Sequence, residues 1–233
     1  IPQEWPINID EFFKDLDQRK ICSFHEVIDF ILNVNPKRHW IAVDFILIIE
    51  AAKTLPFFDQ LNEDDKVTLL ERITVVNVVL LQSFYSAQKN STTLIMPDGL
   101  TPITFTRKFK QMPEKLEIEV FCRCIETLQR IGLNTTEYVL LKTIMYCYSC
   151  IDGLSSRARE ILNKEREKYA LTLLRYMQAQ LGTMEGAKKY AEVISLVETF
   201  FYFAQRNREM HVIISLINNT KLPSPPIVEV LLK

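Results

Sequence analysis

Glycine is scarce in this chain, with only five residues among 233, at positions 99, 132, 153, 182 and 186. No glycine-rich run exists, so the loop with which many nucleotide-binding enzymes cradle a phosphate is excluded. All five glycines lie between segments of regular apolar spacing, where turns are expected, because glycine and proline are the strongest local breakers of regular structure. This distribution predicts long, uninterrupted helices.

An excess of charge of either sign is also missing. The chain has 28 Lys and Arg against 29 Asp and Glu, which leaves a net charge of −1. Such a chain does not attract nucleic acid electrostatically, so any action on DNA would need another part of the protein. Apolar residues make up 48% and charged residues 24%, as in ordinary globular domains, and 233 residues suit one large domain.

A convincing membrane span is missing too. The most apolar segment, residues 67–87, is interrupted by Glu71, Arg72, Asn77 and Gln82, which favours a buried helix. The N-terminus lacks the basic start and apolar run of a signal peptide, and five cysteines are an odd number. These features indicate reduced thiols in the cytosol or nucleus. The chain begins at Ile1 instead of Met, which predicts that it is a piece of a longer protein.

Recognisable catalytic and metal-binding patterns are absent as well. Cys147 and Cys150 have the spacing of half a zinc site, but the nearest other pair, Cys122 and Cys124, would point to opposite faces of a helix. Buried thiols explain these residues better. The three histidines are scattered, with no nucleophile in a recognisable setting. We therefore expect no enzyme, no metal site and no cofactor bound by this chain.

What the chain does contain is helical periodicity almost throughout. The expected helices cover residues 10–32 (one or two helices), 40–55, 67–86, 113–131, 136–150, 154–181 and 186–219. Residues 67–86 carry many β-branched side chains that suit a strand, but the length of this segment favours a central helix. Asn134 and Glu137 have the spacing of a capping box. Between residues 93 and 106, a Pro-Asp-Gly turn separates two short apolar runs and predicts a small β-hairpin.

The most informative stretch is residues 50–70, EAAKTLPFFDQLNEDDKVTLL. Two alanines allow close packing of the first helix, and Pro56 ends it, because proline disfavours helical backbone in the residue before it. Apolar side chains at positions 57, 58 and 61 would pin the turn to the core. Asn62 and the acidic residues 63–65 would cap the next helix, which explains them better than a magnesium site does. Lys53 and Lys66 would then flank one surface groove.

This stretch strongly resembles the signature of nuclear receptor ligand-binding domains. The resemblance runs from about Phe24 to Lys233, and residues 94–102, LIMPDGLTP, look most like the nematode receptors related to the hepatocyte nuclear factor receptors. It implies an all-α fold, a three-layer helical sandwich with one small β-hairpin. The domain would cover residues 21–233, with residues 1–20 as an N-terminal extension or hinge end.

The C-terminal tail carries a second part of the resemblance. Three prolines precede the short amphipathic segment 226–233, and Pro is well placed in a first helical turn. In this family, such a terminal activation helix completes a groove that binds the Leu-x-x-Leu-Leu helices of coactivators, or the helices of corepressors. The residues implied for the groove are Lys53, Lys66, Val67, Leu70, Ile227, Glu229 and Val230. The alternative is that both lysines are ordinary solvated charges and the tail only covers the core.

The resemblance also implies a ligand pocket beneath the central helix. Its candidate lining is mostly apolar and comprises Ile41, Asp44, Phe45, Ile48, Val75, Val78, Val79, Gln82, Tyr85, Leu94, Ile95, His211 and Ile214. The candidate polar anchors are Asp44, Gln82, Tyr85 and His211, and a lipophilic ligand, fatty acid or sterol-like, would fit such a site. Many relatives carry an arginine where this chain has Tyr85, which argues against a fatty acid held by that arginine. Large side chains could equally fill the space.

The wider implications concern partners and location. The resemblance implies homo- or heterodimerisation through the last long helix, with Ala187, Ala191 and Ile194 as candidates, although such a stripe could equally be plain core. It implies a zinc-binding DNA-recognition domain upstream, a location in the nucleus and no membrane contact. Two rival functions are a constitutive docking and dimerisation module with a filled pocket, and an intracellular lipid carrier or helical enzyme.

Overall fold

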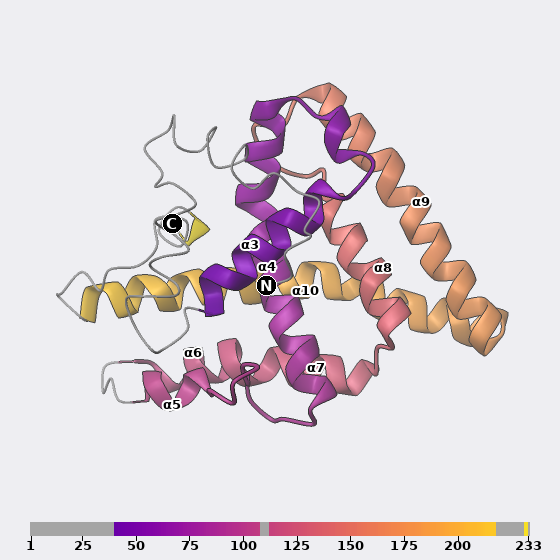
Figure 1. Cartoon of the computed structure of the whole chain (residues 1–233). Helices are drawn as coiled ribbons and strands as arrows, with labels where there is room; N and C mark the ends of the chain where they lie inside the picture. Colours follow the sequence, from indigo (N-terminus) through magenta and orange to yellow (C-terminus); the bar gives the residue numbers. More distant parts are fainter. Residues whose placement is uncertain (1–39, 108–111, 218–230, 233) are drawn as a thin grey trace.

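The computed structural model describes residues 40–107, 112–217 and 231–232 (Figure 1). Within these residues the regular structure is entirely helical, and the predicted all-α class is confirmed. The elements are α3 (Trp40–Lys53), the short 3-10 helix η1 (Phe58–Gln60), α4 (Glu63–Gln88), α5 (Pro102–Thr106), α6 (Glu114–Ile118), the π-helical turn η2 (Glu119–Arg123), α7 (Cys124–Ile131), α8 (Thr135–Tyr146), α9 (Ser156–Leu181) and α10 (Thr183–Ile217).

Helix α4 is the centre of the sandwich. It contacts α3, α7, α8 and α10, and Figure 1 shows α3 on one side of it and α10 on the other. By length and composition α4 could cross a membrane, yet every residue from Ile73 to Leu80 is buried. Burial on all sides explains why its β-branched residues form a helix here, because tertiary packing overrides their weak preference for strands. The prediction of a central helix is confirmed.

At the starts of α4 and α8, the capping residues are those that the sequence predicts. The Asn62 side chain accepts a 2.8 Å hydrogen bond from the Asp65 amide at the start of α4. Asn134 and Glu137 form the predicted capping box. Asn134 Oδ1 accepts from the main-chain amide of Glu137, and Glu137 Oε2 accepts from the main-chain amide of Asn134. These bonds satisfy amide groups that have no partner inside the helix.

The predicted β-hairpin is wrong. A turn does form, because the Met96 amide donates to Leu100 O at 2.8 Å, but α5 occupies residues 102–106 where the second strand was expected. The amides of the first run are used elsewhere: Leu94 donates to Phe121 O, and Ile95 donates to the Ser86 hydroxyl. Because these backbone amides already donate to neighbouring helices, they cannot form the hydrogen bonds that would pair this run with a second strand.

One glycine does not lie in a turn, contrary to the prediction. Gly186 is buried inside the first turns of α10, and a Cβ built there would lie 2.5 Å from Gln178 Cα of α9. Gly182, with φ of 85°, makes the actual reversal between the two helices. Predicted helix ends also shift, since α3 stops at Lys53 and α8 at Tyr146. The helix predicted for 10–32 lies outside the described residues, as does the tail, apart from Leu231 and Leu232.

Candidate functional site

The lysine-flanked surface lies where α3 ends and α4 begins. Lys53 closes α3 and its Nζ lies 3.1 Å from Glu50 Oε1, while Lys66 Nζ lies 2.7 Å from Glu63 Oε1. Lys66 also lies 5.6 Å from the ring centroid of Phe58. Both lysine side chains are only 20% exposed, so their stems cover apolar surface while the ammonium groups are held by a carboxylate one turn earlier.

The apolar groove candidates differ in exposure. Val67 is half-buried and Leu70 is 4% exposed, so Val67 offers more contact area than Leu70. Leu231 and Leu232, the described end of the tail, are buried in the main apolar core. Three further groove candidates, Ile227, Glu229 and Val230, lie outside the described residues.

Two acidic residues that support this surface were not singled out in the sequence for these roles. Glu50 is 4% exposed, and its Oε2 has no hydrogen-bond partner, so a half-satisfied carboxylate lies buried beside Lys53. Asp65 Oδ1 accepts from the Ser155 amide and Asp65 Oδ2 from the Ser155 hydroxyl, each at 2.7 Å. Asp65 therefore joins the first turn of α4 to the first turn of α9. The sequence assigned it only to the cap of its own helix, because Ser155 lies far along the chain.

The candidate ligand-pocket residues fall into two groups. Phe45 and Ile48 are 0% exposed, Val75 1%, and Val78 and Val79 2% and 3%. Side chains with so little accessible surface are packed closely against other protein atoms. Leu94 is buried as well, whereas the remaining apolar candidates, Ile41, Ile95 and Ile214, are half-buried.

A polar junction interrupts this apolar interior. Gln82 Nε2 of α4 donates a 2.6 Å hydrogen bond to Asp44 Oδ2 of α3, and both residues are 8% exposed. Burial raises the pKa of Asp44 to about 6, although Gln82 and the charge of Lys142 act in the opposite direction. The Tyr138 ring stacks on Phe84 at 4.0 Å, and its buried hydroxyl lacks a hydrogen-bond partner. The α8 residues Tyr138 and Lys142 were not predicted for this site.

The other two polar anchor candidates, His211 and Tyr85, are less buried than Asp44 and Gln82. His211 is half-buried on α10, and burial lowers its pKa to about 4, so the imidazole is neutral at pH 7. Tyr85 is half-buried, and Lys89 Nζ lies 5.7 Å from its ring centroid. Of the four polar candidates, Asp44 and Gln82 are therefore the buried ones, whereas Tyr85 and His211 are half-buried.

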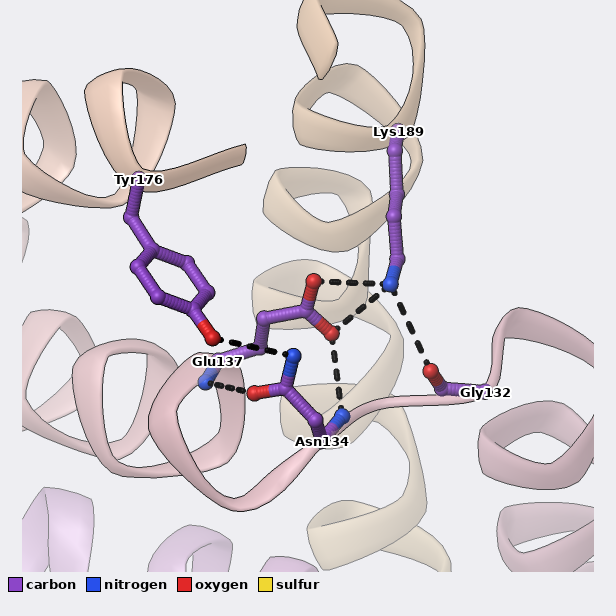
Figure 2. Close-up of polar contacts among 5 residues, drawn as sticks. All are labelled: Gly132, Asn134, Glu137, Tyr176 and Lys189. Carbon is purple, nitrogen blue, oxygen red and sulfur yellow. Dashed lines mark hydrogen bonds and ion pairs between the residues drawn. The ribbon is translucent and has the colours of Figure 1, made fainter. Parts of the chain in front are cut away.

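A cluster of polar contacts, with a partly buried ion pair at its centre, joins α8, α9 and α10 near the start of α8 (Figure 2). Lys189 Nζ of α10 lies 2.7 and 2.8 Å from the two carboxylate oxygens of Glu137 and 3.4 Å from Gly132 O. Asn134 Nδ2 donates to the Tyr176 hydroxyl of α9 at 3.3 Å. The capping box of α8 thus also ties that helix to α9 and α10. Sequence spacing predicted the box but not its partners.

The proposed dimer residues lie on the first half of α10. Ala191 is exposed, and Ala187 is half-buried. Ile194 is half-buried and packs against the core. Ala191 is therefore the candidate with the most surface available to a partner.

The cysteines form no metal site among the residues that the structure describes. Cys122, Cys124, Cys147 and Cys150 are free thiols. Burial raises the pKa of Cys124 to about 11 and raises that of Cys147 as well, which leaves both thiols protonated and unreactive at neutral pH.

Comparison with known proteins agrees with the fold and the signature. The family model described as the ligand-binding domain of nuclear hormone receptor matches residues 31–217. Nuclear hormone receptor family member nhr-60 of Caenorhabditis elegans is 26% identical over 194 residues, covering 83% of this chain and 42% of that protein. Family member nhr-154 of the same organism is 24% identical over 185 residues, covering 77% of this chain and 39% of that protein.

A solved structure shows the same fold. The Ultraspiracle ligand-binding domain from Drosophila melanogaster superposes with a TM-score of 0.64 at 18% identity, covering 82% of this chain and 76% of that chain. This chain spans less than half the length of the curated relatives above.

Proposed function

The chain belongs to the family of nuclear hormone receptor ligand-binding domains, and on that basis we propose that it recruits coregulator helices to a transcription factor. The observation that carries the proposal is the pair of lysines at the end of α3 and the start of α4, each held by a carboxylate, with the half-buried Val67 directly after Lys66. An amphipathic Leu-x-x-Leu-Leu helix would lay its leucines over Val67 between these lysines.

Charge would orient the bound helix. The C-terminal end of a helix carries unsatisfied carbonyls and a partial negative charge, which Lys53 would cap. Glu229 would meet the N-terminal end, as the family resemblance implies. Glu50 and Glu63 hold the two lysines in place before the peptide arrives, which lowers the entropy lost on binding.

The test is binding of a fluorescent Leu-x-x-Leu-Leu peptide by anisotropy. Lys53→Glu should weaken binding at least about tenfold, because it replaces an attraction at the peptide's negative end by a repulsion. Glu229→Lys should abolish binding with little change in thermal stability. Lys164→Glu, an exposed charge on α9, is the matched control and should bind like the wild type. Normal peptide affinity in both Lys53→Glu and Glu229→Lys would refute the groove.

A second proposal is that a small lipophilic molecule regulates this docking. The polar junction of Asp44 and Gln82 within an apolar interior supports it, because ligand sites combine apolar walls with a few polar groups. The ligand would act by binding more tightly when the tail is docked. The tight packing of Phe45, Ile48 and Val75 supports the rival, a constitutive module that needs no ligand.

Native mass spectrometry of the purified chain separates these two alternatives. A discrete added mass supports regulation by a ligand, and extraction of the bound molecule identifies that ligand. Full coregulator binding by a chain of unmodified mass supports the constitutive module.

We further propose that the whole protein acts in the nucleus and binds DNA through a zinc-containing domain outside this chain. The relatives extend well beyond the matched region, which leaves room for such a domain. Homo- or heterodimerisation through α10, with Ala187, Ala191 and Ile194 at the contact, is part of the same proposal. No catalytic activity is proposed for this chain.

A further inference from the structure

Two arginines meet where α10 crosses α4, away from the lysine-flanked surface. Arg208 Nη2 of α10 donates a long hydrogen bond, 3.4 Å, to the main-chain oxygen of Glu71 on α4. The next residue, Arg72, places its guanidinium carbon 5.9 Å from the ring centroid of Phe201 on α10. Phe201 and Arg208 are seven positions apart and therefore share one face of α10. These contacts hold both guanidinium groups at the same helix crossing.

Neither arginine has a carboxylate partner among the described residues. The neighbouring Arg206 is different, because it pairs with both Glu119 and Glu209. Arg208 is half-buried, yet its one hydrogen bond uses a single donor of the five that a guanidinium carries. Burial, and then the charge of Arg72, lower the pKa of Arg208, so the two cations repel each other in a partly desolvated place.

Acidic groups lie in the same region but do not neutralise the pair. The side chain of Glu71 is exposed and forms no ion pair within the described part of the chain. Burial and then the charge of Glu198 of α10 raise the pKa of the Tyr148 hydroxyl, while the charge of Arg72 lowers it. Glu198 also forms no ion pair within the described residues. A half-buried guanidinium whose five donors have only one acceptor among the described residues is costly to keep. An anion would supply the missing acceptors.

We propose that Arg72 and Arg208 form a binding site for a phosphate group. Guanidinium groups match phosphate oxygens through paired, charge-assisted hydrogen bonds, and a dianion would neutralise both cations at once. Tyr148 and Phe201, whose ring centroids lie 4.2 Å apart, form an aromatic wall beside the site. The phosphate could be a free ion or the head group of a lipid. The site shares no residue with the proposed coregulator groove, so the two proposals fail independently.

The test is the thermal stability of the whole chain during titration with inorganic phosphate, against sodium chloride at the same ionic strength. Phosphate at about ten times its Kd should raise the Tm by about 3 °C, because a ligand that binds only the folded state stabilises it. The rise should saturate, and it should vanish in Arg72→Gln and Arg208→Gln. Arg175→Gln, which removes an exposed arginine on α9, should respond like the wild type.

A second arm separates the two sources of phosphate. Vesicles containing phosphatidic acid are compared with vesicles of phosphatidylcholine in a sedimentation assay, using the same variants. Binding to phosphatidic acid alone, lost in Arg72→Gln, identifies a lipid head group even if the free ion is inactive. An equal rise in Tm with phosphate and with chloride, together with no vesicle binding, overturns the proposal. A rise in Tm with phosphate that persists in both Arg72→Gln and Arg208→Gln overturns it as well. Arg72 is exposed, so Arg72→Gln keeps the test valid if Arg208→Gln does not fold.

Discussion

At the scale of single residues, a few ionisable groups lie buried among apolar side chains. Glu137 is 2% exposed and Asp44 8%. Each is held by a partner from another helix, Lys189 in the first case and Gln82 in the second. Because a buried charge without a partner is expensive, replacing either partner should cost far more than replacing a surface charge.

Lys189→Met tests this expectation for Glu137. The substitution should lower the free energy of unfolding by about 3 kcal/mol, because it leaves the buried carboxylate without its cation. Urea denaturation followed by circular dichroism measures the change. Lys188→Met is the matched control: Lys188 is 70% exposed and lies 4.0 Å from Glu185, so its loss should cost no more than about 0.5 kcal/mol. Equal losses in the two variants would contradict a structural role for the buried pair.

The pH dependence of stability tests Asp44. Burial raises its pKa from 3.8 in the unfolded chain to about 6. The folded state therefore binds the proton of the Asp44 carboxyl more tightly than the unfolded chain does. The stability that this protonation confers is complete below about pH 4 and is lost as the pH rises through 6. Asp44→Asn keeps an acceptor for Gln82 but cannot titrate.

Between pH 4 and pH 7, the wild type should therefore lose about 2 to 3 kcal/mol more of its unfolding free energy than Asp44→Asn does. Urea titrations of both proteins at several pH values give this difference. Parallel pH profiles would mean that Asp44 is not desolvated in the folded protein.

At the scale of elements, the α9–α10 reversal depends on one missing side chain. Gly186 lets the start of α10 pass directly against the backbone of α9 at Gln178. The reversal aligns α10 so that Lys189 reaches Glu137 of α8. A close approach of two helix backbones leaves no room for even a methyl group, so the element cannot adjust without moving as a whole.

Gly186→Ala should destabilise the domain by at least about 3 kcal/mol, because the added methyl overlaps backbone atoms that cannot rotate away. Thermal unfolding by calorimetry measures the effect. Ala179→Ser, at an exposed position of α9, should change stability by no more than about 0.5 kcal/mol. A stable Gly186→Ala protein would show that the two helices are farther apart than the structure has them.

At the scale of the whole molecule, the proposed dimer contact lies on the outer surface of α10. Ala191 is exposed there, whereas Ile194 also belongs to the packed core. Ala191→Arg should therefore convert a dimer to a monomer while leaving the melting temperature of the monomer unchanged. Light scattering after size-exclusion chromatography, run across a range of concentrations, measures the mass. An unchanged dimer mass would move the proposed interface away from this position.

The sequence by itself determined the helical class, the signature turn and the starts of several helices. The caps of α4 and α8 at Asn62 and Asn134 were predicted because a cap joins residues three apart. The buried character of α4 was predictable from the high share of apolar residues in its middle. The lysine pair was predictable as a surface pattern, because both lysines lie within one stretch that crosses a single turn.

Tertiary structure alone decided the contacts between distant segments. The pairings of Asp65 with Ser155 and Asp44 with Gln82 join residues 90 and 38 positions apart, which periodicity does not encode. The β-hairpin failed for the same reason, since the donors it needed are used by other helices. Local signals act through neighbours in the chain, so they identify the elements. Which buried polar group meets which partner depends on how those elements pack.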